Sequence, residues 1–419
     1  MRADIDRAAV AALADEQVDW RFKGLPPSWS GRTVAHVCAQ RPRLFHDGPT
    51  RAHDAPTGPL CVLSRDALEH NLATMASWCR RAGVELAPHG KTHMAPQLFS
   101  RQLAAGACAI TVATISQARV CRAFGVDSVI LANELVDVAG LHWLAAELDA
   151  DPQFRFVCWV DSVRAVHLMS AELAAAGGGR PVDVCVEVGM AGGRTGCRTA
   201  AQVDEVGRAV AASPQLRLVG ICGYEAALGH DVTAGALERV TGYLADLRAA
   251  VQRLAGCFEA DEVLVTAGGS TYFDAVADVL TGWPGGLAVR TVIRSGAYLT
   301  HDDGLYARTS PLARAFRPAL TVWAQVVSRP EPDLALLAMG RRDVSFDQDL
   351  PVPYRLAHSH VVKLNDQHAY LRLAPQSRLA VGTWLEFGIS HPCTVFDKWQ
   401  LIPVLDADGR VVDLVRTFF

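Results

Sequence analysis

The sequence lacks a charge excess, a long uncharged hydrophobic stretch and any internal repeat. Its 419 residues carry a formal net charge of −4, which gives no electrostatic case for binding nucleic acid or an acidic membrane surface. The opening stretch, MRADIDRAAVAALADEQVDW, has Asp and Glu within its apolar part. We therefore expect neither a signal peptide nor a membrane-spanning helix.

A disulfide framework is also lacking, although cysteines are present. The 11 cysteines are odd in number and scattered, often within apolar runs such as VDVCVEV. This pattern is typical of free thiols in a reducing compartment. We therefore expect a cytoplasmic protein.

Short apolar runs alternate with helical patterns as far as about residue 294. The predicted strands cover residues 59–63, 84–88, 108–113, 128–133, 155–161, 182–188, 216–223, 262–268 and 288–294. Amphipathic stretches lie between them, for example residues 199–213 and 236–256. Uniformly hydrophobic strands separated by helices are typical of a parallel sheet covered on its outer face. Eight or nine such units over about 240 residues favour a β/α barrel over an open sheet.

The pattern changes after roughly residue 315, where strand-like runs such as ALTVWAQVVSR and HAYLRL follow one another with few helical patterns. We predict an α/β protein of three parts. Residues 1–58 are an N-terminal extension that packs on the β domain, residues 59–314 form a (β/α)8 barrel, and residues 315–419 form a β-rich domain.

Lys91 stands in the stretch ELAPHGKTHMAPQ, after the second predicted barrel strand and before a helical pattern. In a barrel, the loops at the carboxyl ends of the strands converge on one cavity and carry the chemistry. A lysine that is partly buried there near other cations would have a lowered pKa and a nucleophilic amine. The alternative is a lysine that extends to solvent, which is the common case for this residue type.

Two later strand ends offer small residues with free backbone N–H groups. These are TAGGST (266–271) and RSGAY (294–298), and such turns bind phosphate oxygens. Each alone is weak evidence, since a Gly-Gly turn is usually only a turn. A lysine and two phosphate-binding turns on one barrel face together describe a pyridoxal phosphate site.

Five segments together resemble the D-threonine aldolase and D-serine dehydratase family, the alanine-racemase-like pyridoxal phosphate enzymes. They are PHGKTHM, EVGMAGGRTGC, VTAGGSTY, RSGAYLTHD and GISHPCTVFDKW, in this order along the chain. The resemblance implies that Lys91 forms the Schiff base with the cofactor and that His391 and Cys393 bind a metal. It implies cofactor contacts from Arg194, Tyr224, Gly268, Gly269, Ser270, Thr271, Ser295, Gly296 and Tyr298. It also implies a homodimer.

Two departures from the family pattern concern the cofactor contacts. Many relatives have an acidic residue in EVDxGxxRxG, where this chain has EVGMAGGRTG around Arg194. The segment GYEAALGH, which contains Tyr224, falls where relatives place a Gln-Ala-Tyr or a His-and-Tyr segment.

The residues of SHPCT also argue for a metal by themselves. Imidazole and thiolate select a borderline-soft ion, of which zinc is the most available. Two protein ligands are too few for a closed structural site, whereas open positions for water or substrate are typical of a catalytic one. The alternative is that His391 is an ordinary polar residue and Cys393 a buried thiol.

The resemblance implies a small D-amino acid as substrate, with Lys91 facing one side of it. A metal at the β-hydroxyl would promote either elimination of water or cleavage between Cα and Cβ. In this family the dehydratase branch tends to have His-x-Cys and the aldolase branch His-x-Asp, so we expect a D-serine or D-threonine dehydratase. A D-threonine-type or hydroxyaspartate aldolase remains an alternative. A non-catalytic pyridoxal phosphate carrier and an alanine racemase are further alternatives, but neither would use the metal pair.

Overall fold

Parallel strands and helices alternate from residue 85 to residue 293 in the structure, a computed structural model that describes residues 3–45 and 55–419. The strands are β2 (Glu85–Leu86), β3 (Ile110–Val112), β4 (Ser128–Glu134), β5 (Arg155–Val160), β6 (Val182–Val188), β7 (Leu216–Gly223), β8 (Val263–Ala267) and β9 (Val289–Ile293). The helices are α4 (Pro96–Ala104), α5 (Ile115–Ala123), α6 (Val138–Ala150), α7 (Val163–Ala176), α8 (Ala200–Ala211), α9 (Ala234–Arg253) and α10 (Phe273–Leu280). The helices predicted at 199–213 and 236–256 are thus confirmed as α8 and α9.

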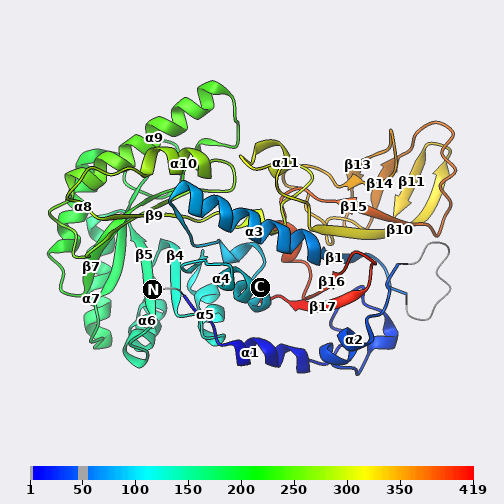
Figure 1. Ribbon diagram of the computed structural model, residues 1–419, viewed down its shortest axis with the longest axis horizontal. Helices are drawn as coiled ribbons and strands as arrows, with labels where there is room; N and C mark the ends of the chain where they lie inside the picture. The colour runs from blue at the N-terminus through cyan, green and yellow to red at the C-terminus, as the bar shows by residue number, and fades with distance from the viewer. Residues whose placement is uncertain (1–2, 46–54) are drawn as a thin grey trace. The chain divides into compact units, whose positions relative to one another are not determined.

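The eight strands form one parallel sheet in the order β2-β9-β8-β7-β6-β5-β4-β3. Backbone bonds around β2 close this sheet on itself. The N–H of Ala87 donates to Ile293 on one side, while the carbonyls of Leu86 and Pro88 accept from Cys108 and Thr111 on the other. The helices lie outside the strands (Figure 1). The prediction of a β/α barrel is confirmed.

Side chains from all around the ring fill the inside of the barrel. The inward-facing cluster consists of Ala87, Ala109, Ile130, Trp159, Cys185, Val219, Cys222, Leu264 and Val292. Trp159, the largest of them, is almost completely buried. The barrel is therefore a packed core rather than a pore, and its chemistry is confined to the end where the loops lie.

Polar residues begin several of the barrel helices. Thr114, Asp137 and Ser162 each accept a hydrogen bond from the backbone N–H three residues further on. Thr199 and Gln202 form a reciprocal capping box at the start of α8. Each cap satisfies a backbone donor at the helix start and so fixes where the loop after the strand ends.

The remaining strands form a second, mixed sheet, and the mostly-β C-terminal domain is thereby confirmed. They are β1 (Leu60–Ser64), β10 (Leu320–Glu331), β11 (Leu334–Leu337), β12 (Val352–Pro353), β13 (His360–Leu364), β14 (Ala369–Arg372), β15 (Trp384–Gly388), β16 (Leu401–Leu405) and β17 (Val411–Arg416). Their order is β13-β14-β11-β10-β1-β16-β17, and β15 pairs with β10 and β12. The other helices are α1 (Arg7–Ala11), α2 (Val34–Gln40), α3 (Arg65–Ala82), α11 (Leu305–Thr309) and α12 (Cys393–Phe396).

Strand β1 corrects one sequence-based expectation. The strand predicted at 59–63 forms, but it pairs antiparallel with β10 and parallel with β16 instead of joining the barrel. Lys91 consequently follows the first barrel strand, not the second. The hydrophobic run LCVLS predicts a buried strand, yet nothing in it distinguishes one buried sheet from another.

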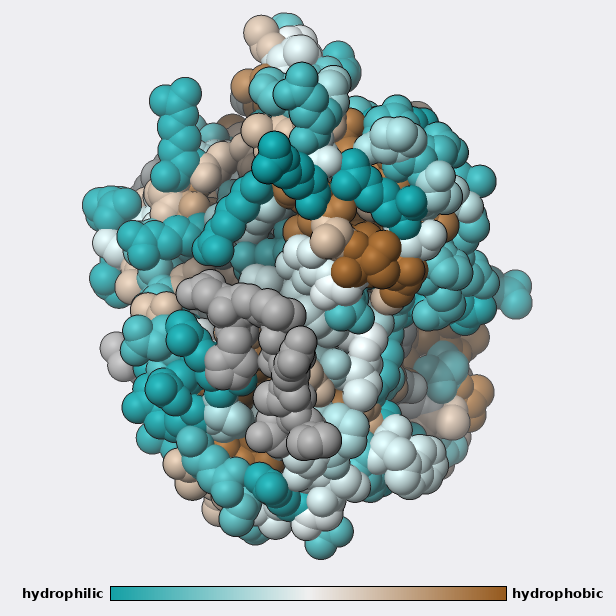
Figure 2. All heavy atoms as spheres, turned by 90° about the vertical axis from the view of Figure 1, so that its right-hand side faces the viewer, coloured by the Kyte–Doolittle hydropathy of each residue, from teal (hydrophilic) through white to brown (hydrophobic). Residues whose placement is uncertain are grey.

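The chain divides into two compact units that are each discontinuous in sequence. The first comprises Met1–Asp6, Met75–Lys91 and Phe99–Gly296, and the second comprises Arg7–Thr74, Thr92–Leu98 and Ala297–Phe419. On the face shown in Figure 2, hydrophilic side chains lie around smaller hydrophobic patches. Among the helices of residues 3–45 and 55–419, none has both the length and the hydrophobicity needed to cross a bilayer.

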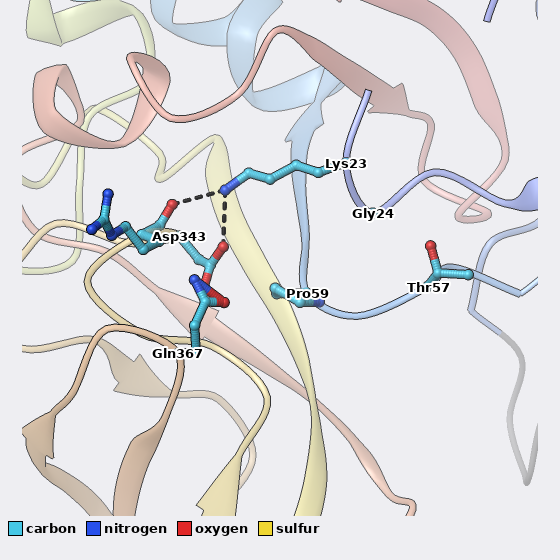
Figure 3. Close-up of a pocket in the computed structure, with 7 residues that line it drawn as sticks. Lys23, Gly24, Thr57, Pro59, Asp343 and Gln367 are labelled. Carbon is cyan, nitrogen blue, oxygen red and sulfur yellow. Dashed lines mark hydrogen bonds and ion pairs between the residues drawn. The ribbon is translucent and has the colours of Figure 1, made fainter. Parts of the chain in front are cut away.

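N-terminal residues are anchored to loops that follow strands of the second unit's β sheet. The Nζ of Lys23 donates to Asp343 at 2.9 Å and to the carbonyl of Arg342 at 2.8 Å, and it lies 4.0 Å from the ring centroid of Trp399. Figure 3 shows these bonds beside a pocket of about 490 Å³ that Thr57, Pro59 and Gln367 also line. The lysine is engaged in structural bonds, so this pocket is a junction between the N-terminal residues and the sheet.

Two glycines give a paired test of barrel packing. A Cβ on Gly220 of β7 would lie 1.9 Å from the carbonyl oxygen of Leu264 on β8, whereas one on Gly242 of helix α9 would meet nothing within 4 Å. Gly220→Ala should destabilise the chain by about 2–3 kcal/mol or more, because a backbone carbonyl must move. Gly242→Ala should stabilise it by about 0.5–1 kcal/mol. Urea unfolding midpoints measure both, and equal midpoints for the two variants would contradict the observed β7–β8 packing.

Candidate active site

Lys91 lies in a short turn, Gly90–Thr92, at the end of the barrel where the carboxyl ends of the strands meet. The turn is fixed by close packing. A Cβ on Gly90 would lie 2.7 Å from the ring of Phe99 and 2.8 Å from the side chain of Ile110. Only glycine fits there, so the backbone that carries Lys91 is held firmly. Lys91 itself is half-buried.

Three cationic side chains surround His89 at the same barrel end. Burial is the largest cause that lowers the pKa of His89 well below its usual value, followed by the charges of Lys91, Arg294 and Arg194. The imidazole is therefore neutral at physiological pH. Its Nδ1 is a buried atom with no hydrogen-bond partner among the residues that the structure describes. The barrel end is thus a positively charged environment suited to an anionic ligand.

Arg194 is presented by a tightly bonded loop between β6 and α8. The N–H of Gly196 donates to the carboxylate of Asp161 at 3.1 Å. The N–H of Cys197 donates to the carbonyl of Glu187 in β6, and the carbonyl of Cys197 accepts from the N–H of Gly189. Arg198 donates to several carbonyl groups within the loop, that of Arg194 included. The guanidinium of Arg194 is exposed.

The guanidinium carbon of Arg194 lies over the ring of Tyr224, 4.3 Å from the ring centroid. The backbone of Tyr224 is fixed by Tyr243 of helix α9. The hydroxyl of Tyr243 accepts from the N–H of Tyr224 at 3.0 Å and donates to the carbonyl of Val188 at 2.5 Å. The ends of β6 and β7 are therefore linked through one phenol group, and Arg194 and Tyr224 come together as a pair.

The turn after β8 contains the predicted residues Gly268, Gly269, Ser270 and Thr271. The N–H groups of Gly268 and Gly269 donate to the carboxylate of Glu225 at 2.9 and 2.6 Å. The two glycine amides that were predicted to bind a phosphate are thus bonded to the carboxylate of Glu225. Further along, the hydroxyl of Thr271 lies 3.0 Å from Nδ1 of His230.

The turn after β9 contains Ser295 and Gly296. The hydroxyl of Ser295 donates to the carbonyls of Gly268 and Gly269, both at 3.1 Å. The two predicted phosphate-binding turns are therefore joined to each other. This supports the expectation that they belong to one site.

Arg294, directly before Ser295, is buried at the end of β9. Its guanidinium donates to the hydroxyl of Thr266 and to the carbonyl of Gly223, each at 2.7 Å, and lies 5.5 Å from the ring centroid of Trp159. These partners are neutral, so the positive charge of Arg294 adds to that of Lys91 and Arg194.

Carboxyl groups gather at the ends of β4, β5 and β6. Burial raises the pKa of Glu134 to about 8, and neighbouring Glu187 and Asp161 add to this effect. Both oxygens of the Glu134 carboxyl are buried without a hydrogen-bond partner among the described residues, and Glu187 is almost completely buried. Because its pKa lies near 8, the Glu134 carboxyl keeps its proton at neutral pH, which lowers the cost of burying it.

His391 and Cys393 lie together in the second unit, after β15. His391 has a left-handed backbone with φ of 60°, and its N–H donates to Asp302 at 2.8 Å. Asp302 also accepts from the N–H groups of Gly304, Tyr306 and Ala307. The loop that carries the histidine is thus tied to a fixed carboxylate, which accounts for its strained conformation.

Asp347 orients the His391 ring. Its Oδ2 lies 2.5 Å from Nδ1 of His391, while its Oδ1 accepts from the hydroxyl of Thr394. Burial lowers the pKa of His391, but Cys393 and Asp347 outweigh it and raise the value to about 9. The Cys393 thiol is 3.4 Å from the hydroxyl of Thr92, the residue that directly follows Lys91 in the chain.

Tyr298, the last predicted cofactor contact, belongs to the second unit. It is buried, with its ring centroid 6.1 Å from that of Phe316. Compact packing thus brings Lys91, Arg194, Tyr224 and both turns together in the first unit, and Tyr298, His391 and Cys393 fall in the second. A groove of about 1060 Å³ between Trp323, Trp384 and Asp406 includes none of the predicted site residues.

Two family models match the chain. Residues 319–405 match a putative serine dehydratase domain, and residues 63–281 match the N-terminal domain of alanine racemase. The second match covers more than half of the 419 residues. The chain belongs to the alanine racemase family. Together with the serine dehydratase match, this confirms the predicted resemblance to the alanine-racemase-like enzymes.

Relatives within the alanine racemase family include both aldolases and dehydratases. The D-threonine aldolase of Arthrobacter sp is 29% identical over 85% of this chain and 90% of its own length. The D-threo-3-hydroxyaspartate dehydratase of Delftia sp. (strain HT23) is 27% identical over 84% of this chain and 95% of its own. The solved D-threonine aldolase from Filomicrobium marinum has a TM-score of 0.74 at 26% identity, covering 88% of this chain and 98% of that one.

Three residues of the candidate site in this chain were not predicted from its sequence. Arg294 gave a usable signal, since it is a charge at the end of an apolar strand run, directly before a predicted turn. Tyr243 lies within a helical pattern and Asp347 in a segment without any pattern, so neither could be singled out. Within the described residues, no three metal-binding side chains come together, and His391 and Cys393 remain a pair.

The proton held by Glu134 should make stability depend on pH. The carboxyl titrates near 4.5 in a free chain and near 8 when folded. Between these values the folded chain binds more protons, so its free energy of unfolding should fall as pH rises from about 5 to about 8. Glu134→Gln cannot ionise and should flatten this fall.

Thermal midpoints between pH 5 and pH 9 measure the effect. Glu238→Gln, at an exposed glutamate of helix α9, is the matched control and should keep the original slope. An unchanged slope in Glu134→Gln would show that this carboxyl holds no extra proton.

Proposed function

We propose that the chain is a pyridoxal phosphate- and zinc-dependent lyase that dehydrates and deaminates a D-3-hydroxy amino acid, such as D-serine or D-threonine. The products are a 2-oxo acid and ammonia. The names of the relatives support the substrate class, because threonine and 3-hydroxyaspartate both carry a hydroxyl on the β-carbon.

The residues of the barrel end fit pyridoxal phosphate. Lys91 supplies an amine for covalent attachment, Arg194 and Arg294 supply positive charge near it, and Ser295 links the two turns that are offered to the phosphate. When bound, the cofactor withdraws electrons from the α-carbon of the substrate and weakens its bonds. In this proposal Lys91 then takes the α-proton from the one face of the substrate that it meets, and so selects one enantiomer.

The donors of the second unit fit zinc. An imidazole and a thiol are borderline-soft ligands, and two of them leave coordination positions open, as in catalytic zinc sites. Asp347 bonds Nδ1 of His391, so Nε2 would be the ring atom available to hold a metal. When bound, zinc would supply a Lewis acid for a departing hydroxide.

The observation that carries the choice of reaction is the pairing of the Cys393 thiol with the His391 imidazole. In the family resemblance, His-x-Cys is typical of the dehydratase branch. The second candidate is cleavage to glycine and an aldehyde, which the identity to the Arthrobacter D-threonine aldolase favours.

Product analysis separates the two reactions. With D-serine and D-threonine we expect pyruvate and 2-oxobutyrate, each with ammonia. Lys91→Ala should lose turnover by at least about 10³-fold, because the proton acceptor is removed. Borohydride treatment with pyridoxal phosphate should label the Lys91 peptide in the original chain. Glycine and acetaldehyde as products of D-threonine would instead support the aldolase.

Removal of Cys393 should separate the roles of metal and cofactor. Cys393→Ala should bind pyridoxal phosphate normally but lose about three decades in the dehydration rate, since a Lewis acid contributes several kcal/mol to departure of hydroxide. β-Chloro-D-alanine has a leaving group that needs no such help, so its turnover should persist.

Cys257→Ala, at a half-buried cysteine outside the site, is the control and should retain full activity on both substrates. If Cys393→Ala dehydrates D-serine at the original rate, the metal has no part in the reaction.

A further inference from the structure

Glu225 is a completely buried glutamate at the start of the short turn Glu225–Leu228, directly after β7. Each of its carboxylate oxygens accepts one backbone N–H, from Gly268 at 2.9 Å and from Gly269 at 2.6 Å. Among the ion pairs of the described residues, none involves Glu225. Because a buried carboxylate is costly without strong hydrogen bonds, these two amides are what keeps it in place.

The two amides have the geometry of an anion-binding turn. They are consecutive, and Gly268 has φ of 95°, a conformation that glycine adopts readily. The carboxylate therefore occupies a position where a phosphate oxygen could have been bound. Either it competes with the cofactor phosphate for these amides, or it is a permanent part of the turn.

The surroundings of the turn favour a permanent part. The carbonyl of Gly268 accepts from the N–H of Arg294 and from the hydroxyl of Ser295, which also donates to Gly269. A Cβ on Gly269 would lie 3.2 Å from the Tyr224 ring and 3.3 Å from Oε1 of Glu225, so no free space separates the two segments. The turn is bonded through its amides on one side and through its carbonyls on the other.

We propose that Glu225 is a positioning residue that holds the Gly268–Gly269 turn, so that the cofactor phosphate is met by Ser270 and Thr271 and not by the two glycine amides. The inference rests on the proposed pyridoxal phosphate function. In this proposal the turn binds two anions at adjacent places. Gly268 and Gly269 bind the Glu225 carboxylate, and Ser270 and Thr271 bind the cofactor phosphate.

The test compares Glu225→Ala and Glu225→Gln with the exposed control Glu238→Gln. Pyridoxal phosphate and pyridoxal, which lacks the phosphate, are titrated separately by absorbance. Glu225→Ala should weaken pyridoxal phosphate by about tenfold or more, because two bonds to a charged group are lost. Glu225→Gln keeps one acceptor and should show a smaller loss. The affinity for pyridoxal should change little in either variant, and the control should match the original chain.

Hydrogen exchange of the peptide that contains Gly268 and Gly269 gives a readout that does not need the cofactor. Two protected amides should become one in Glu225→Gln and none in Glu225→Ala. If Glu225→Ala does not fold, the glutamine variant still decides the question. Equal or tighter binding of pyridoxal phosphate by Glu225→Gln would overturn the proposal, as would unchanged exchange. Failure of the original chain to bind either compound would instead refute the proposed function, while the exchange data would still test the bonds of Glu225.

Discussion

A strand in the middle of a parallel sheet has hydrogen-bonded neighbours on both edges. The two strands at the ends of the sheet must either be covered or pair with each other to close a barrel. Here the join is made by β2, a strand of only Glu85–Leu86, and by the residues that follow it. Pro88 and His89 continue the pairing with Thr111 beyond the regular strand. The turn that carries Lys91 begins one residue later, so closure of the barrel and placement of the lysine depend on the same backbone bonds.

Charge is distributed unevenly around the barrel end. Lys91, Arg194 and Arg294 surround His89, while Glu134 and Glu187 gather at the ends of β4 and β6. On the acidic side the raised pKa of Glu134 keeps that carboxyl neutral, and on the basic side neutral carbonyl and hydroxyl groups accept from Arg294. A cationic region of this kind favours an anionic ligand.

Much of this architecture was predictable because it depends on periodicity. Alternating apolar and amphipathic runs predicted the barrel, and the change of pattern near residue 315 predicted the β domain. Lys91 and the two turns could be identified because each follows a predicted strand. The partners of β1 could not be predicted, since a buried strand carries no mark of its sheet. Glu225 and Asp347 act through side-chain contacts between segments far apart in sequence, and no local pattern reports such contacts.

Strand β1 also has a consequence for how the chain folds as it is synthesised. Its buried residues pair with β10 and β16, and Leu63 lies opposite both Leu320 and Val404. All eight barrel strands leave the ribosome between β1 and these partners. The barrel can therefore assemble while β1 still presents an apolar edge to solvent. Strand β1 is made before the barrel strands and is covered after them, so its edge depends on the later strands β10 and β16, or on a chaperone, for protection.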